Sequence, residues 1–174
     1  AGIDIPTLCH HDALAPYGAC RLCVVEISKG ARSRLVTSCV YTVEEGLAVE
    51  TESERVLRAR RLVLEFLLAR APGAQKLHEY AARYGVQPGR FALEPTECIL
   101  CGLCVRYCAE VKKKGAIGFI GRGTERAVMF FPAIAAVECP QCGECYPLCP
   151  TGVMPSIYAL SRVPHFDWAE SPRL

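Results

Sequence analysis

The spacing of twelve cysteines constrains this chain of 174 residues more than any other feature. Eight of them form two runs of the same pattern, C-x2-C-x2-C-x3-C, at residues 98–108 and 139–149. The other four are Cys9, Cys20, Cys23 and Cys39. Cysteines two residues apart are poor disulfide partners, but they can bind one metal centre together. The spacing therefore favours metal ligation over a disulfide scaffold, and it indicates the reducing cytoplasm as the compartment.

The two identical runs have the spacing that bacterial ferredoxins use to bind [4Fe-4S] clusters. In a two-cluster ferredoxin the fourth cysteine of each run binds the cluster of the other run. We therefore assign one cluster to Cys98, Cys101, Cys104 and Cys149. We assign the other to Cys108, Cys139, Cys142 and Cys145. A pair of zinc sites is the alternative, but zinc is usually bound by two separated C-x2-4-C pairs rather than by cysteines in repeated steps of three.

The four N-terminal cysteines approximate the plant-type [2Fe-2S] spacing, C-x4-C-x2-C…C, with a first gap of ten residues instead of four. Gly18 and Ala19 are small residues before Cys20, so backbone N–H groups can approach the sulfurs. We predict one [2Fe-2S] cluster bound by Cys9, Cys20, Cys23 and Cys39, with a single zinc ion as the open alternative. His10 and His11 lack the spacing of a two-histidine Rieske centre, and we interpret them as residues at the surface or behind the ligands.

Four segments follow from the patterns along the chain. We expect an α+β protein divided into residues 1–50, 51–90, 91–155 and 156–174. In the first segment, residues 24–27 and 34–36 are predicted strands on either side of a turn at Lys29 and Gly30, and residues 47–50 form a further short strand. The last segment is predicted to be a short helix followed by an extended aromatic tail that contains Phe166 and Trp168.

The second segment is predicted to be a helical connector. Thr51 and Glu54 fit a capping box at the start of its first helix, which Pro72 and Gly73 end. A second helix carries one apolar face at helical spacing, and Gly85 suits its C-terminal cap. The connector contains no cysteine, so we expect no cluster at residues 51–90.

Composition argues against several other classes of protein. A net charge of +2 lacks the basic excess of a nucleic-acid-binding protein. The longest apolar run, residues 127–137, is too short to cross a bilayer and contains Pro132. The sequence shows no secretory signal, but it begins without Met and inside what resembles a structured element, so we expect the true N-terminus to precede Ala1. Three consecutive lysines, residues 112–114, are interpreted as a solvated turn, with an acidic docking partner as the alternative.

No catalytic residue and no nucleotide site is assigned. The chain shows no Ser/His/Asp arrangement and no pair of acidic residues suited to catalysis. Gly118, Gly121 and Gly123 do not match G-x-G-x-x-G and lack its strand–helix context. The chemistry therefore concentrates in the cysteines.

The segments CHHDALAPYGACRLCVVEI, ECILCGLCVRYC and CPQCGECYPLCPTG together resemble a known family. They are similar to the N-terminal iron–sulfur part of the complex I 75-kDa-type subunit. The same module occurs in the diaphorase part of NAD-linked hydrogenases, in iron-only hydrogenases and in NAD-dependent formate dehydrogenases. The resemblance implies a β-grasp [2Fe-2S] domain whose first hairpin would precede Ala1, then a helical connector, then a ferredoxin-like domain with two [4Fe-4S] clusters.

Many members of that family hold a further cluster in the connector, bound by one histidine and three cysteines. The connector here, LARAPGAQKLHEYAARYGV, lacks those cysteines. His78 is therefore interpreted as a helix-surface residue rather than a ligand.

The resemblance implies an electron-transfer subunit of a multi-subunit NAD(P)H-linked oxidoreductase. Such a subunit relays single electrons between an NAD(P)H-oxidising flavoprotein subunit and a catalytic subunit, and substrate chemistry takes place elsewhere. A free, diffusing polyferredoxin is the second hypothesis. A zinc-stabilised structural module is the third.

Overall fold

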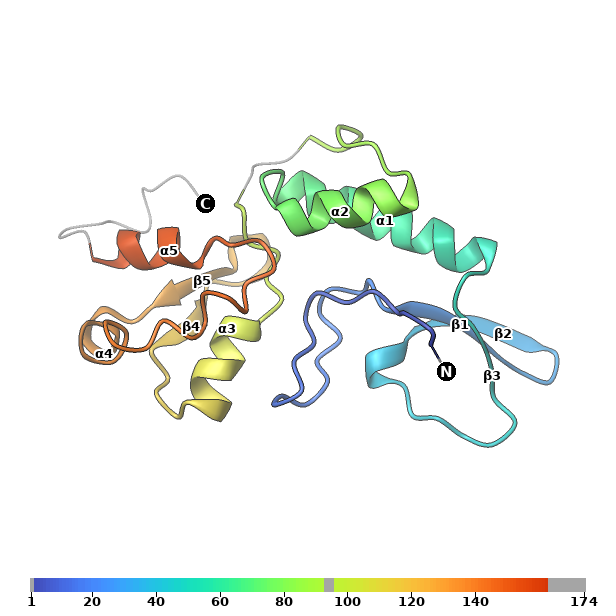
Figure 1. The fold of residues 1–174 in the computed structure, drawn as a ribbon, viewed down its shortest axis with the longest axis horizontal. Helices are drawn as coiled ribbons and strands as arrows, with labels where there is room; N and C mark the ends of the chain where they lie inside the picture. Colours follow the sequence, from blue (N-terminus) through green and yellow to red (C-terminus); the bar gives the residue numbers. More distant parts are fainter. Residues whose placement is uncertain (1, 93–95, 163–174) are drawn as a thin grey trace.

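The computed structural model describes residues 2–92 and 96–162, which form a mixed α/β protein with two small sheets. A three-stranded sheet lies toward one end of the molecule and a two-stranded sheet lies toward the other (Figure 1). Helices α1 (Glu54–Arg70) and α2 (Gln75–Tyr84) lie along one side of the N-terminal part (Figure 1). The expected α+β class is confirmed at this coarse level. The predicted aromatic tail lies outside the described residues.

The N-terminal sheet has the order β2-β1-β3, from β1 (Val24–Lys29), β2 (Arg32–Thr37) and β3 (Ala48–Glu50). Both neighbours of β1 are antiparallel to it. Gly30, with a φ of 61°, allows the tight turn between β1 and β2. The three strands predicted from the sequence are thus confirmed.

A carboxylate on β1 joins the sheet to the first helix. Glu26 accepts hydrogen bonds from Ser33 on β2, from the Ser53 hydroxyl at 2.6 Å and from Arg55 at 2.5 Å. These three donors, with Ser33 the strongest, hold the pKa of Glu26 below its usual value. The side chain of Glu26 therefore fixes where α1 starts relative to the sheet.

Helix α1 begins two residues later than the predicted capping box requires. Ser53 is its N-cap, and the Ser53 hydroxyl accepts a hydrogen bond from the Val56 N–H at 3.3 Å. The prediction that Thr51 and Glu54 form the capping box is therefore wrong. The helix start is shifted by a residue distant in sequence, because the contact with Glu26 places Ser53, rather than Thr51, at the N-cap.

Helix α2 packs beside α1 after a break at Pro72 and Gly73. The predicted apolar face consists of Leu77, Tyr80, Ala81 and Tyr84. It packs on the core as expected, with Leu77, Ala81 and Tyr84 buried and Tyr80 half-buried. Gly85 has a φ of 64° and its N–H bonds back into the helix, as a C-terminal cap should. His78 is exposed, and its Nε2 lies 2.7 Å from the Pro72 carbonyl oxygen, which agrees with a helix-surface role.

The C-terminal part begins with α3 (Leu103–Arg106), which widens into one π-helical turn at Tyr107–Val111. Strands β4 (Ile117–Ile120) and β5 (Ala127–Phe130) then form an antiparallel hairpin. The remaining elements are α4, α5 and two short 3₁₀ turns, at Pro132–Glu138, Met154–Ser161, Ser38–Val40 and Gly123–Glu125. The last predicted helix thus starts two residues earlier than expected.

The apolar run at residues 127–137 is divided between two elements. Its first part is β5 and its second part is α4, which has Pro132 at its first position.

Gly118 and Gly121, near this run, are glycines because the packing leaves no room for a side chain. A side chain at Gly118 would meet the Phe131 ring, and one at Gly121 would meet the Glu125 carbonyl oxygen. No helix of the described residues is long and apolar enough to span a membrane.

Two hydrophobic cores organise the molecule. One joins the N-terminal cysteine loop to α1 and α2, and the other lies between β5, α5 and the second cysteine run. Helix α1 buries one residue per turn, and these are Val56, Arg60, Leu64 and Leu68. Leu64 and Leu68 belong to the first core. Three of the four are apolar, and the arginine stands out.

Leu64 and Leu62 give a matched test of this core. Leu64 is fully buried, whereas Leu62 on the same helix is 41% exposed. Leu64→Ala should lower the free energy of unfolding by about 2–5 kcal/mol, because it leaves a cavity. Leu62→Ala makes the same chemical change and should cost less than about 0.5 kcal/mol. Equal losses in anaerobic denaturant titrations would contradict the packing described for α1.

Candidate metal centres

The four N-terminal cysteines come together around one loop. The Cys20 N–H donates to the Cys9 sulfur at 3.4 Å, and the sulfurs of Cys23 and Cys39 are 3.4 Å apart. Cys9, Cys20 and Cys23 are buried and Cys39 is half-buried. Backbone N–H groups of Gly18 and Ala19 also approach sulfurs of the set, as their small size predicts.

Contacts between these thiols change their pKa values. A hydrogen bond from the Cys9 thiol lowers the pKa of Cys20 to about 5, and the same contact raises the pKa of Cys9, together with burial. Burial, then the contact with Cys23, raises the pKa of Cys39 to about 11. A metal centre bound by all four sulfurs must therefore displace protons that the protein alone retains.

The first cysteine run and the last cysteine of the second run line one small cavity. Cys98, Cys101, Cys104 and Cys149 face it, with Val128 and Met154 among its apolar walls. Burial raises the pKa of Cys101 to about 12, and the neighbouring charges of Cys149 and Cys98 add to the rise. Cys149 thus lies beside the three cysteines of the other run.

A second cavity joins the last cysteine of the first run to the first three cysteines of the second run. It is lined by Cys108, Cys139, Cys142 and Cys145. Burial raises the pKa of Cys145 to about 12, and the charges of Cys139 and Cys108 contribute further. Ala116 donates its N–H to the Cys108 sulfur at 3.3 Å, which holds this side chain near the partner run. The structure therefore brings together both crossed sets that the spacing predicts, while ligation itself stays a prediction.

Each run turns sharply after its second cysteine. Gly102 and Gly143, at this repeated position, have φ values of 78° and 61°. A side chain at Gly102 would also lie 3.1 Å from the Tyr17 ring. The glycine of the repeat thus supplies left-handed backbone in both copies, and in the first copy it permits close approach to the N-terminal loop.

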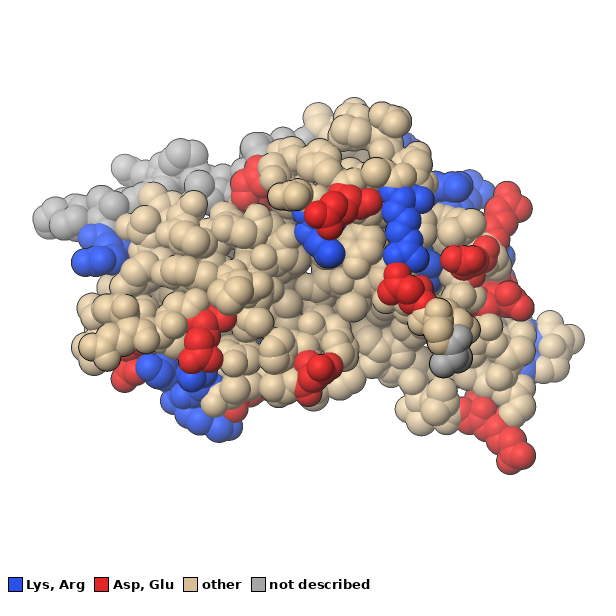
Figure 2. Space-filling model, in the orientation of Figure 1, with Lys and Arg blue, Asp and Glu red and all other residues tan. Residues whose placement is uncertain are grey.

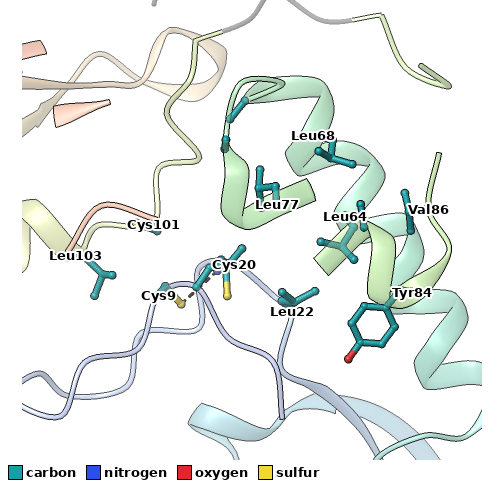
Figure 3. Close-up of a cluster of buried hydrophobic side chains, with 14 of the residues drawn as sticks. Cys9, Cys20, Leu22, Leu64, Leu68, Leu77, Tyr84, Val86, Cys101 and Leu103 are labelled. Atoms are coloured by element: carbon teal, nitrogen blue, oxygen red, sulfur yellow. Dashed lines mark hydrogen bonds between the residues drawn. The ribbon is translucent and has the colours of Figure 1, made fainter. Parts of the chain in front are cut away.

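The three thiol sets are adjacent in space. Cys101 belongs to the same buried core as Cys9 and Cys20 (Figure 3), and the charge of Cys20 is among the causes of the raised pKa of Cys101. Cys145 in turn is among the charges that raise the pKa of Cys104, after burial and nearer thiols. The order in space is therefore the N-terminal set, the Cys98 set and the Cys139 set.

Helix α3 is docked onto the N-terminal loop by polar and aromatic contacts. Arg106 donates from Nη2 to the Ala15 carbonyl oxygen at 2.8 Å, and its guanidinium lies 4.9 Å from the Tyr17 ring centroid. His11 meets Tyr107 edge-on, with ring centroids 5.2 Å apart. Sequence reasoning missed these contacts, although Arg106 and Tyr107 lie between two predicted ligands.

The lysine run forms contacts within the chain. Lys112 pairs with Glu144 at 2.5 Å, and Lys114 pairs with Glu138 at 2.7 Å. Both glutamates belong to or adjoin the second cysteine run, so these pairs connect the segment after the π-helical turn to that run. The predicted solvated turn is therefore wrong for two of the three lysines, because acidic partners distant in sequence fold against them.

The donor chemistry of the three sets fits iron–sulfur clusters. In the described part of the chain, no three His, Cys, Asp or Glu side chains lie close enough together to hold a single metal ion. Each ferredoxin-like set instead presents four thiols around a common cavity that also has apolar side chains in its walls. Thiolates from four cysteines are the usual ligands of both [2Fe-2S] and [4Fe-4S] clusters.

Two family models match the regions that hold these cysteines. Residues 1–54 match the 2Fe-2S iron-sulfur cluster binding domain. Residues 90–155 match the ferredoxin-like domain of NADH-quinone oxidoreductase subunit 3. Each cysteine set with its loop thus lies within a matched region.

Curated relatives match nearly the full chain. An NADH-quinone oxidoreductase subunit of Rhizobium meliloti (strain 1021) is 32% identical over 98% of this chain and 23% of its own length. The NADH-ubiquinone oxidoreductase 75 kDa subunit of Dictyostelium discoideum is 30% identical, over 94% of this chain and 28% of its own. The NADP-reducing hydrogenase subunit HndD of Solidesulfovibrio fructosivorans is 32% identical, over 87% of this chain and 31% of its own length. The chain therefore spans between about a quarter and a third of these relatives.

A solved structure shares the fold as well. The crystal structure of an NAD+-reducing [NiFe]-hydrogenase in the H2-reduced state contains a chain with a TM-score of 0.62 and 34% sequence identity. The match covers 73% of this chain and 63% of that one. Sequence and fold thus point to the same group of proteins.

Three serine variants test the crossed arrangement without prior assignment of signals. Cys104→Ser and Cys149→Ser should alter the same cluster signal, because both thiols face one cavity. Cys145→Ser should alter a different signal. Electron paramagnetic resonance of the anaerobically reduced variants compares them directly. An effect of Cys149→Ser that matches Cys145→Ser instead would show that the runs bind their clusters without crossing.

Proposed function

Since this chain resembles the N-terminal iron–sulfur part of the complex I 75-kDa-type subunit, we propose that it is an electron-transfer subunit of a multi-subunit NAD(P)H-linked oxidoreductase. Its partners are an NAD(P)H-oxidising flavoprotein subunit and a subunit that carries out the substrate chemistry. The chain itself carries no catalytic residue in this proposal. The names of its relatives support the assignment, since they are subunits of NADH and NADP oxidoreductases and hydrogenases.

The proposed cofactors are one [2Fe-2S] and two [4Fe-4S] clusters. Cys9, Cys20, Cys23 and Cys39 would hold the first. Cys98, Cys101, Cys104 and Cys149 would hold the second. Cys108, Cys139, Cys142 and Cys145 would hold the third. When bound, such clusters accept and donate one electron at a time.

One observation carries the function more than any other, namely the adjacency of the three thiol sets. The N-terminal set meets the Cys98 set at Cys20 and Cys101, and the Cys98 set meets the Cys139 set at Cys104 and Cys145. A storage or structural role has no need for such a row, whereas electron transfer requires short steps between centres. The docking of Arg106 onto the loop at Ala15 keeps the first step short.

The domain organisation is part of the proposal. In this proposal residues 1–50 are a [2Fe-2S] domain of β-grasp type, and the observed sheet of β1, β2 and β3 would be part of it. Residues 51–90 are the connector, residues 91–155 the two-cluster domain and residues 156–174 the C-terminal segment, although helix α5 already starts at Met154. The face in Figure 2 carries Lys and Arg interspersed with Asp and Glu, which suits protein partners better than nucleic acid.

Metal analysis tests the cofactors. Anaerobically purified protein should contain about ten iron and ten acid-labile sulfide per chain, as one [2Fe-2S] and two [4Fe-4S] clusters require. The measurement is iron, zinc and sulfide content on the same sample. Zinc in place of iron, without sulfide, would establish the structural zinc module instead.

Association tests the partners. Affinity capture of the chain from its native cells under anaerobic conditions should yield a stoichiometric flavoprotein with NAD(P)H-oxidising activity. The complex should reduce added one-electron acceptors with NAD(P)H. A chain that elutes as a stable monomer with full iron content, and without a flavoprotein, would favour the diffusing polyferredoxin.

A further inference from the structure

A buried arginine lies in the apolar stripe of α1. Arg60 is 1% exposed and occupies the stripe between Val56 and Leu64. Arginine is rarely buried without a counter-charge, since its guanidinium stays ionised in proteins. Its position therefore requires a reason that packing alone does not give.

The contacts of Arg60 are all to neutral groups. Nη2 donates to the Val24 carbonyl oxygen at 2.9 Å, and Nη1 donates to the Tyr84 hydroxyl at 3.2 Å. The guanidinium carbon lies 5.7 Å from the Tyr84 ring centroid. Nε has no hydrogen-bond partner in the part of the chain that the structure describes.

Several arginines of the chain bond to neutral groups, but Arg60 is the one among the described residues that is also buried. Arg55, Arg83, Arg90 and Arg106 each form an ion pair with a carboxylate. Among residues 2–92 and 96–162, no carboxylate forms such a pair with Arg60. A buried cation without an anion is costly, so a negative group nearby would stabilise it.

The N-terminal thiol set is the best-placed candidate for that negative group. The residue whose carbonyl oxygen binds Arg60 is Val24, which directly follows Cys23. Leu22, between Cys20 and Cys23, lies in the same core as Leu64, one helical turn from Arg60 (Figure 3). Arg60 is thus bonded to the backbone immediately after Cys23, at the end of the loop that carries two of the four sulfurs.

We propose that Arg60 is the buried counter-charge of the N-terminal iron–sulfur site and raises its reduction potential. This inference rests on the proposed [2Fe-2S] assignment. Four thiolates give such a cluster a net negative charge, and reduction adds one electron and no compensating cation. A fixed positive charge next to Cys23 therefore stabilises the reduced form of the cluster more than the oxidised form.

The size of the effect follows from Coulomb's law. As an order of magnitude, two unit charges about 10 Å apart at an effective dielectric constant of about 20 interact strongly enough to change the ratio of reduced to oxidised cluster roughly tenfold. A surface arginine, screened by water and salt, should change that ratio little.

Redox titration of the intact protein, followed by electron paramagnetic resonance, tests the proposal. Arg60→Gln keeps a donor for the Val24 carbonyl oxygen and removes the charge. It should lower the ratio of reduced to oxidised [2Fe-2S] cluster about tenfold at a fixed ambient potential. Arg60→Lys keeps the charge and should leave the potential near that of the unaltered protein. Arg58→Met, on the exposed face of the same helix, is the matched control and should leave it unchanged.

A second variant separates charge from hydrogen bonding. Tyr84→Phe removes the hydroxyl that accepts from Arg60 but keeps the cation, so it should preserve the potential. If Tyr84→Phe and Arg60→Gln shift the potential equally, or if Arg60→Gln leaves it unchanged with an intact signal, the counter-charge is overturned. If Arg60→Gln loses the cluster but keeps the circular dichroism of the folded backbone, and Arg60→Lys keeps both, the result supports a requirement for positive charge at residue 60. Loss of fold in Arg60→Lys and Arg60→Gln alike would assign the residue to packing and overturn the proposal.

The same titration distinguishes this inference from the function on which it rests. A [2Fe-2S] signal missing from the unaltered protein would contradict the cofactor assignment itself. A normal signal with a potential insensitive to Arg60 would contradict only the counter-charge.

Discussion

The packing of Cys101 into the core that holds Cys9 and Cys20 is the contact on which the arrangement of this protein depends. It joins the first cysteine run to the N-terminal loop, and α1 and α2 close the same core from the other side. Arg106 on α3 stabilises this contact by binding the Ala15 carbonyl oxygen and packing on the Tyr17 ring. Because these parts share one core, the distance between two of the thiol sets is fixed by side-chain packing rather than by a linker.

Burial gives the thiol sets their chemistry. Desolvation raises the pKa of most of the described cysteines of the ferredoxin-like part, so the protein without metal favours neutral thiols there. Backbone N–H groups at left-handed turns oppose this by donating to the sulfurs, as at Leu100 beside Cys98. Bound iron would supply the remaining stabilisation of the thiolates, so cluster binding and proton release would be coupled.

Sequence reasoning found what is encoded locally. The repeated spacing predicted two crossed sets, and the thiols of each set line a shared cavity. Gly30 and Gly85 marked a turn and a helix end because each needs left-handed backbone. The reasoning failed where a distant residue decides, since Ser53 replaced Thr51 as the cap because Glu26 reaches it from β1. The apolar periodicity of α1 gave no sign that Arg60 would be buried.

A crystal structure of the anaerobically purified protein, with diffraction data at the iron absorption edge, tests the central claim most directly. The account predicts three iron centres in a row, with Cys20 and Cys101 between the first two and Cys104 and Cys145 between the last two. It also predicts Cys149 bound to the same centre as Cys98. Separate iron centres with Cys108 bound beside Cys98, or anomalous signal at the zinc edge in their place, would contradict it.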